Sequence, residues 1–190
     1  MVERDLEVEL LVRLRAGDPS AFDEIYGLLH PRLFSFLSRM VRNRSVAQDL
    51  AEETWVRLAA SGKKLHDGTR LVPWLFTVAR NLYVSYCRSR AREQAYTADL
   101  VFLWPGELPR SPFDLASLNE FEEQLEAALA ELPPLYREAL LLTAVEGMRP
   151  ADAAAVCGIG VEAFRQRLSR ARAMLAKRLG SARALKEVSW

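Results

Sequence analysis

The fold of this chain is decided by residues 151–172, ADAAAVCGIGVEAFRQRLSRAR. Ala154, Gly158 and Phe164 have the spacing of a helix-turn-helix: a small residue at the helix crossing, a turn glycine and an apolar anchor on the second helix. The predicted second helix offers five apolar residues to a core: Val161, Phe164, Leu168, Ala171 and Leu175. Its other faces carry four arginines: Arg165, Arg167, Arg170 and Arg172. Because such arginines meet phosphates and base edges, the segment predicts DNA binding.

A plainer interpretation of this segment is open. Any helical bundle contains helix pairs joined by glycine turns, and a surface helix can be rich in arginine for solubility alone. The turn spacing and the basic helix coincide here, and that coincidence favours DNA binding.

Composition limits the class of protein. Half of the 190 residues are hydrophobic, and abundant Ala and Leu favour helices. No apolar stretch is long enough for a membrane span, and the acidic start MVERDLEVELL is unlike a signal peptide, so a cytoplasmic protein is expected. Cys87 and Cys157 match no metal-ligand spacing and, with His30 and His66, make no zinc set. They predict buried thiols in a reducing compartment, with a redox sensor as the alternative.

The net charge of +1 conceals strong segregation along the chain. Residues 57–92 hold eight basic residues against Asp67 alone, and residues 162–186 hold eight against Glu162 alone. Residues 93–131 between them hold nine acidic residues and one arginine. Two basic blocks separated by an acidic connector predict two nucleic-acid contact surfaces.

The N-terminal residues 1–41 predict two helices. The first is amphipathic, with a stripe of leucines, and ends near Gly17. Asp18 and Pro19 form an N-cap and a first-turn proline for the second helix. Pro31 is expected to kink or divide that helix.

A third helix is predicted over residues 46–60. Ser45 with Gln48 resembles a capping box at its start, and Gly62 marks its end. Its inner stripe comprises Ala47, Leu50, Ala51, Thr54 and Leu58. Another face is acidic and partly apolar, with Asp49, Glu52, Glu53 and Val56. Such a face is either a solvated helix side or, for a basic partner, a docking surface.

A polar loop at residues 61–69 precedes a fourth helix. Four of its residues are predicted to face inward: Leu71, Leu75, Val78 and Leu82. The others mix aromatic, amide and basic groups: Trp74, Arg80, Asn81, Tyr83, Arg88 and Arg90. This mixture suits single-stranded nucleic acid, because a ring stacks on a flipped base while arginines hold phosphates. Core packing is the alternative for Trp74.

Residues 94–118 lose helical periodicity and gain three prolines, which predicts a flexible linker. Phe102, Trp104 and Phe113 indicate that this linker docks on a partner. Asn119 opens a helix to about residue 132, and Pro133 ends it.

A further helix over residues 135–145, with Gly147 as its stop, leads into the helix-turn-helix. The sequence therefore predicts an all-α fold of two small helical domains, residues 1–93 and 119–190, on a flexible linker.

Four motifs, in this order along the chain, resemble those of extracytoplasmic-function (ECF) sigma factors, a compact bacterial class that keeps only sigma regions two and four. QDLAEETWVRL (48–58) is similar to the region that grips the coiled coil of the largest polymerase subunit. PWLFTVARNLYVSYCRSR (73–90) resembles the helix bordering the upstream promoter-melting element. ELPPLYREALLLTAVEGM (131–148) and AFRQRLSRAR (163–172) match the opening of region four and its recognition helix.

The resemblance implies a protein that binds core RNA polymerase and directs it to particular promoters. The implied polymerase-docking residues are Asp49, Glu52, Glu53, Trp55 and Val56. The implied major-groove contacts at the minus-thirty-five element are Arg165, Gln166, Ser169 and Arg170, while Arg167 and Arg172 suit backbone contacts or intramolecular pairing. The implied contacts to the melted non-template strand of the minus-ten element are Lys63, Lys64, His66, Trp74, Arg80, Asn81 and Arg88.

The same resemblance implies an anti-sigma factor that covers the docking surfaces, and no cofactor. Three positions depart from common family residues. Ala163 replaces a threonine, Glu52 replaces a glutamine, and Ser85 stands where an acidic residue is usual. Ser85 points to an unusual promoter preference, and Ala163 implies the loss of one phosphate contact.

The same residues leave three rival functions to consider. A stand-alone helix-turn-helix regulator, dimeric on a palindrome, leaves the first basic block without a role. A sigma-like decoy that binds an anti-sigma factor predicts weakened recognition residues, whereas Arg165 and Arg170 are intact. An enzyme has the least support, because the chain has no glycine-rich phosphate loop and no nucleophile beside a histidine base.

Overall fold

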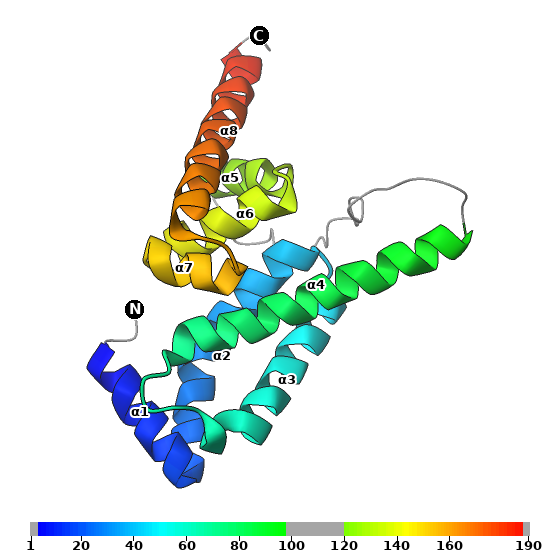
Figure 1. Cartoon of the computed structure of the whole chain (residues 1–190). Helices are drawn as coiled ribbons and strands as arrows, with labels where there is room; N and C mark the ends of the chain where they lie inside the picture. Colours follow the sequence, from blue (N-terminus) through cyan, green and yellow to red (C-terminus); the bar gives the residue numbers. More distant parts are fainter. Residues whose placement is uncertain (1–3, 98–119, 188–190) are drawn as a thin grey trace. The chain divides into compact units, whose positions relative to one another are not determined.

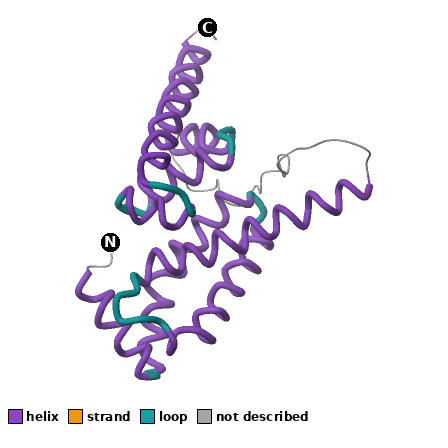
Figure 2. Tube along the Cα trace, in the orientation of Figure 1, coloured by secondary structure: helices purple, strands orange, loops and turns teal. Residues whose placement is uncertain are grey.

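The structure is a computed structural model that describes residues 4–97 and 120–187, with side chains for 4–93 and 121–180. The chain divides into two compact units, Met1–Arg110 and Ser111–Trp190 (Figure 1). Every regular element in the described ranges is helical (Figure 2). The predicted all-α fold is therefore confirmed.

The first unit contains helices α1 (Arg4–Ala16), α2 (Pro19–Val41), α3 (Arg44–Ser61) and α4 (Leu71–Thr97), with a 3-10 turn at Gly62–Lys64. Its core is formed by side chains that are at most 2 % exposed from all four helices, among them Leu10, Ile25, Leu33, Phe36, Leu58, Leu75 and Phe76. The rings of Phe36 and Phe76 meet edge to face at 5.3 Å. Burial of these side chains supplies the main driving force for the unit.

Two helix boundaries in this unit differ from those predicted. Pro31 does not divide α2, because Leu29 and Leu33 on either side of it are buried while Pro31 itself faces outward. Asn43, and not Ser45, caps α3: its side-chain oxygen accepts from the amide of Val46 at 3.1 Å. Helix α4 also extends beyond the predicted boundary at residue 93.

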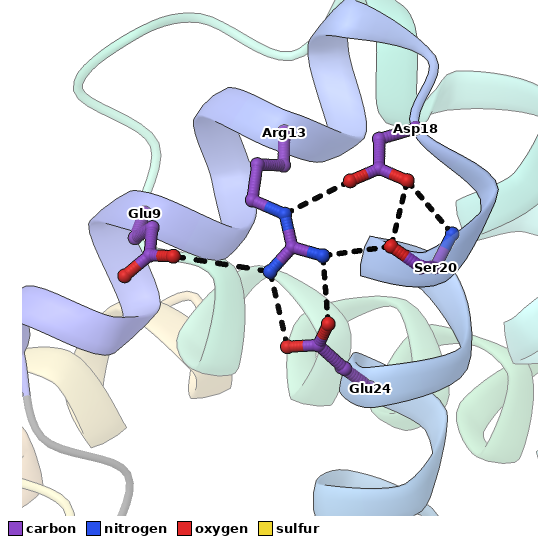
Figure 3. A network of polar contacts seen from close by, with 5 residues as sticks. All are labelled: Glu9, Arg13, Asp18, Ser20 and Glu24. Carbon is purple, nitrogen blue, oxygen red and sulfur yellow. Dashed lines mark hydrogen bonds and ion pairs between the residues drawn. The ribbon is translucent and has the colours of Figure 1, made fainter.

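The α1–α2 junction is fixed by polar contacts around Arg13 (Figure 3). The guanidinium of Arg13 donates to both carboxylate oxygens of Glu24, at 2.6 and 3.1 Å, and to Asp18 at 2.9 Å. Asp18 is the predicted N-cap of α2 and accepts from the amide of Ser20 at 2.9 Å. This network joins the end of one helix to the start of the next.

The second unit contains helices α5 (Glu120–Ala130), α6 (Pro134–Leu140), α7 (Pro150–Cys157) and α8 (Val161–Glu187), with a π-helical turn at Leu141–Val145 after α6. The predicted break at Pro133 is confirmed, whereas the predicted cap Asn119 lies outside the described residues. Arg137 is 5 % exposed and donates to the carbonyls of Leu129 and Leu132 at 2.9 and 3.0 Å. A buried guanidinium thus satisfies carbonyls left open at the end of α5.

Candidate nucleic-acid and polymerase interfaces

Helices α7 and α8 form the predicted helix-turn-helix. Gly158 adopts φ +65° in the turn, and its amide donates to the carbonyls of Ala154 and Ala155. This left-handed conformation is accessible to glycine without a steric penalty. Ala154 and Phe164 are 1 % and 0 % exposed, as the spacing predicted. Phe164 anchors α8 and leaves the opposite face of that helix to solvent.

The solvent face of α8 carries most of the predicted minus-thirty-five contacts. Five are exposed: Arg165, Gln166, Ser169, Arg170 and Arg172. Positions 165, 166, 169 and 170 lie on one side of the helix, since residues three and four apart are neighbours on a helix surface. Arg165 lies 3.6 Å from Glu162, an exposed pair that solvent weakens.

Arg167 differs from these five residues. Its side chain is 21 % exposed, and its Nη1 lies 3.8 Å from the Oε2 of the buried Glu138 on α6. The same Oε2 accepts from the thiol of Cys157 at 3.3 Å. Arg167 therefore makes the intramolecular pair that was one of its two predicted roles, and it is not presented on the face with Arg165.

The second candidate surface lies on the first unit. Lys63, Lys64 and His66 are exposed between α3 and α4. Trp74, Asn81 and Arg88 recur every seven residues on α4, so they form one stripe along it. Asn81 and Arg88 are exposed, while Trp74 and Arg80 are half-buried.

The phase predicted for α4 is partly wrong. Leu71 and Leu75 are buried as expected, but Val78 and Leu82 are only half-buried. Phe76 and Ala79 take the inner positions, together with Tyr83 and Cys87 further along the helix. Burial raises the pKa of the Cys87 thiol, which stays protonated at neutral pH.

The third candidate surface is the acidic side of α3. Asp49, Glu52 and Glu53 are exposed, and Val56 is an apolar residue that is 61 % exposed beside them. Spacings of three, four and seven residues place them on one face. Glu53 pairs with Arg57 on the same helix at 2.9 Å.

Trp55 does not belong to that exposed face. Its side chain is 5 % exposed, and its indole Nε1 donates to the Nδ1 of His30 at 3.1 Å. The rings of Phe22 and Tyr26 lie 6.1 and 4.9 Å from it. The predicted surface role of Trp55 is corrected to one of core packing between α2 and α3.

Tyr26 is 41 % exposed and was not predicted as part of a site. It stacks on His30 at 4.6 Å and touches Trp55, so it adds an aromatic edge next to α3. The four-residue spacing of Phe22, Tyr26 and His30 on α2 was the available signal.

Two absences concern only the described part of the chain. None of its helices combines the length and apolarity needed to cross a membrane. Nor do its His, Cys, Asp and Glu side chains form a group of three or more that could hold a metal ion.

Comparison with known proteins defines the class. Residues 25–93 match the family described as Sigma-70 region 2, and residues 122–175 match Sigma-70, region 4. The two units are thus the two conserved regions of a sigma-70-type sigma factor. The sigma factor CarQ of Myxococcus xanthus is 33 % identical over 88 % of this chain and 94 % of its own length. The ECF sigma factor EcfG of Rhodopseudomonas palustris is 39 % identical over 76 % of this chain and 77 % of its own.

A solved structure agrees with these relatives. The sigma factor RpoE in complex with the anti-sigma factor NepR, from Bartonella quintana, superposes with a TM-score of 0.68 and 31 % identity. The match covers 84 % of this chain and 96 % of that one. The chain belongs to the ECF family of RNA polymerase sigma factors. As a sigma factor it directs core RNA polymerase to promoters, and the stand-alone regulator is not favoured.

Proposed function

We propose that the three surfaces divide the work of promoter recognition. The exposed face of α8 reads the minus-thirty-five element, the segment at residues 62–69 with the α4 stripe holds the melted minus-ten strand, and the acidic side of α3 docks on core polymerase. The observation that carries this division is the segregation of basic side chains on α8 and α4 from carboxylates on α3. Opposite charges suit them to different partners.

The α8 face reads duplex DNA through base edges. Arg165 and Arg170 are exposed and lie on the same face as Gln166 and Ser169. An arginine that donates two hydrogen bonds to the O6 and N7 of guanine contributes about 1–3 kcal/mol of discrimination. Arg172 lies two turns further along α8 than Arg165 and contacts the phosphate backbone.

The minus-ten strand meets the exposed side chains of residues 62–69 and the α4 stripe. Lys63, Lys64 and His66 hold a base flipped from the duplex, and Asn81 and Arg88 follow the displaced strand. Base flipping costs a few kcal/mol, which stacking and phosphate contacts offset. Trp74, the half-buried first residue of the stripe, and the half-buried Arg80 complete this surface.

Docking on polymerase uses Asp49, Glu52, Glu53 and Val56, with Tyr26 adjacent. Charge reversal at Glu52, by Glu52→Lys, is expected to slow association with core polymerase several-fold, and more so at low salt. Asp5→Lys on α1 is the matched control, because it reverses an exposed charge away from α3. Equal association rates for the two variants would remove α3 from the docking surface.

An anti-sigma factor covers these docking surfaces in the resting state, and the protein works in the cytoplasm, where its polymerase is. The 31 % identical RpoE is found in such a complex, which supports this proposal. The partner here buries exposed apolar residues next to the charged faces, such as Val56 and Tyr26.

Run-off transcription with sigma-free core polymerase on fragmented genomic DNA tests the proposal as a whole. Discrete start sites that depend on added protein are expected, with shared sequences upstream. Tight duplex binding without any transcript would instead support a stand-alone regulator. Absence of both activities would support a decoy for an anti-sigma factor.

A further inference from the structure

Helix α1 lies outside both matched family regions, the first of which begins at residue 25. It nevertheless packs against the connection between α3 and α4, the segment proposed to hold the minus-ten strand (Figure 1). No role has been assigned to α1 by the sequence motifs or by the three surfaces. Its contacts reach the connection at both ends.

The start of the connection touches the end of α1. Gly62 packs so closely on Leu14 that a Cβ at Gly62 would lie 3.0 Å from the Leu14 Cδ2. One residue further on, the Lys63 side chain lies against Gly17, the turn residue after α1. Arg15 forms an ion pair with Asp67 in the middle of the connection. The proposed base-holding segment thus rests on residues 14–17.

The end of the connection is held by Glu7. This carboxylate is 6 % exposed, and its Oε1 accepts from the backbone amide of Val72 at 2.9 Å. Val72 is the second residue of α4, whose first amides have no partner within the helix. The Oε2 of Glu7 lies 4.0 Å from Arg70. Glu7 therefore caps α4 from a position 65 residues earlier in the chain.

Helix α1 is itself fixed to α2 through the Arg13 network (Figure 3). The two-pronged contact of Arg13 with Glu24 and its bond to Asp18 restrain the C-terminal end of α1. The buried leucines Leu10 and Leu11 fix the same helix to the core. An element held in this way can restrain a loop that packs on it.

We infer that α1 is a brace that positions residues 62–72 for selective capture of a minus-ten base, with Glu7 as the positioning residue. This inference rests on the proposed function of the 62–69 segment. The brace fixes where Lys63 and His66 stand relative to α4, and so sets base preference without touching DNA. Contacts at both ends of the segment, and an ion pair in its middle, support this role.

The test is transcription by holoenzyme from a promoter library randomised at both elements, with transcripts sequenced to give base preferences. Glu7→Leu removes the cap and is expected to reduce minus-ten preference about tenfold while leaving minus-thirty-five preference unchanged. Glu7→Gln keeps an acceptor for the Val72 amide and is expected to restore most of it. Val12→Ser, on the exposed side of α1, is the control expected to match the unaltered protein.

A second pair of variants guards against misfolding of Glu7→Leu. Gly62→Ala displaces Leu14 and shifts the start of the segment, whereas Gly27→Ala in α2 meets no atom within 4 Å. Of these two glycine variants, only Gly62→Ala is expected to lower minus-ten preference. Unchanged preference in both Glu7→Leu and Gly62→Ala, or an equal loss at both promoter elements, would overturn the brace.

Loop variants separate this inference from the function on which it rests. The triple variant Lys63→Ala, Lys64→Ala, His66→Ala changes minus-ten preference if the proposed function holds. If the triple variant leaves minus-ten preference unchanged, the proposed role of the segment is wrong and the proposed role of α1 is wrong with it. If the triple variant changes minus-ten preference while the α1 variants behave as the unaltered protein, only the proposed role of α1 is wrong.

Discussion

The two surfaces that we propose face promoter DNA are built in different ways. In the second unit, α8 presents its contacts from a regular helix anchored by Phe164, and the turn before it is closed by hydrogen bonds within five residues. In the first unit, residues 62–69 are largely irregular and are held by α1, about fifty residues earlier. A local motif fixes one surface, and long-range packing fixes the other.

The largest effect is expected when Phe164, the residue that anchors the helix-turn-helix, is removed. Phe164→Ala empties a fully buried site and is expected to cost about 3–5 kcal/mol. Thermal unfolding followed by circular dichroism measures the loss, together with minus-thirty-five duplex binding. A loss of less than about 1 kcal/mol would show that α8 does not depend on this anchor. Val161→Ala, at a residue that is 37 % exposed, is the milder control.

The face of α8 is predicted to be separable from its core. Arg165→Ala, at an exposed residue, is expected to leave the unfolding temperature unchanged and to cost about 1–3 kcal/mol of discrimination at one base pair. Arg172→Ala is expected to weaken binding equally on all sequences, because phosphates carry no sequence information. Competition binding on single-base promoter variants distinguishes the two, and identical profiles would contradict the assignment.

Two glycines, Gly62 after α3 and Gly27 in α2, test how closely residues 62–69 pack on α1. Gly27→Ala, in an α-helix with open space around it, is expected to stabilise the protein by about 0.4–1 kcal/mol. Gly62→Ala lacks that gain, because its Cβ crowds Leu14, which is 7 % exposed. Denaturant titration measures both. A gain of equal size in the two variants would show that Gly62 is not required for close approach.

The smallest expected effect concerns the Arg13 network, which fixes α1 to α2. Hydrogen bonds from Ser20 and Arg13 lower the pKa of Asp18, and those from Arg13 lower the pKa of Glu24. Carboxylates with a lowered pKa stabilise the fold above their unfolded-state pKa of about 4, and this contribution is lost as pH falls through the folded-state pKa.

Arg13→Ala should therefore flatten the loss of stability in the acid range and lower stability slightly at neutral pH. Unfolding temperatures measured from neutral pH to the acid range check this, with Val12→Ser as the control. Parallel curves for Arg13→Ala and the unaltered protein would contradict a stabilising role for the network.

Sequence reasoning succeeded where the signals are local. The spacing of Ala154, Gly158 and Phe164 predicted the helix-turn-helix, and Asp18 with Pro19 predicted the start of α2. These features depend on residues a few positions apart. Helical periodicity also predicted the exposed arginines Arg165, Arg170 and Arg172 of α8, whereas Gln166 and Ser169 were named through the family resemblance.

The errors occur where tertiary packing overrides a local signal. Pro31 does not interrupt α2, because buried neighbours on the same helix hold it together. Trp55 was placed on the surface beside Val56, whereas a pocket of aromatic residues from α2 takes it into the core. Glu7 carried no motif at all, since its partner Val72 is distant in the sequence. Such contacts are visible only when the helices are assembled.

We propose that two separately built surfaces read two separate promoter elements. The test of this proposal is transcription from the doubly randomised promoter library by two holoenzymes. One carries the alanine triple variant of Lys63, Lys64 and His66, and the other carries Arg165→Ala. We expect the triple variant to alter base preference at the minus-ten element only, and Arg165→Ala to alter it at the minus-thirty-five element only. Changes at the same element in both, or at neither, would contradict it.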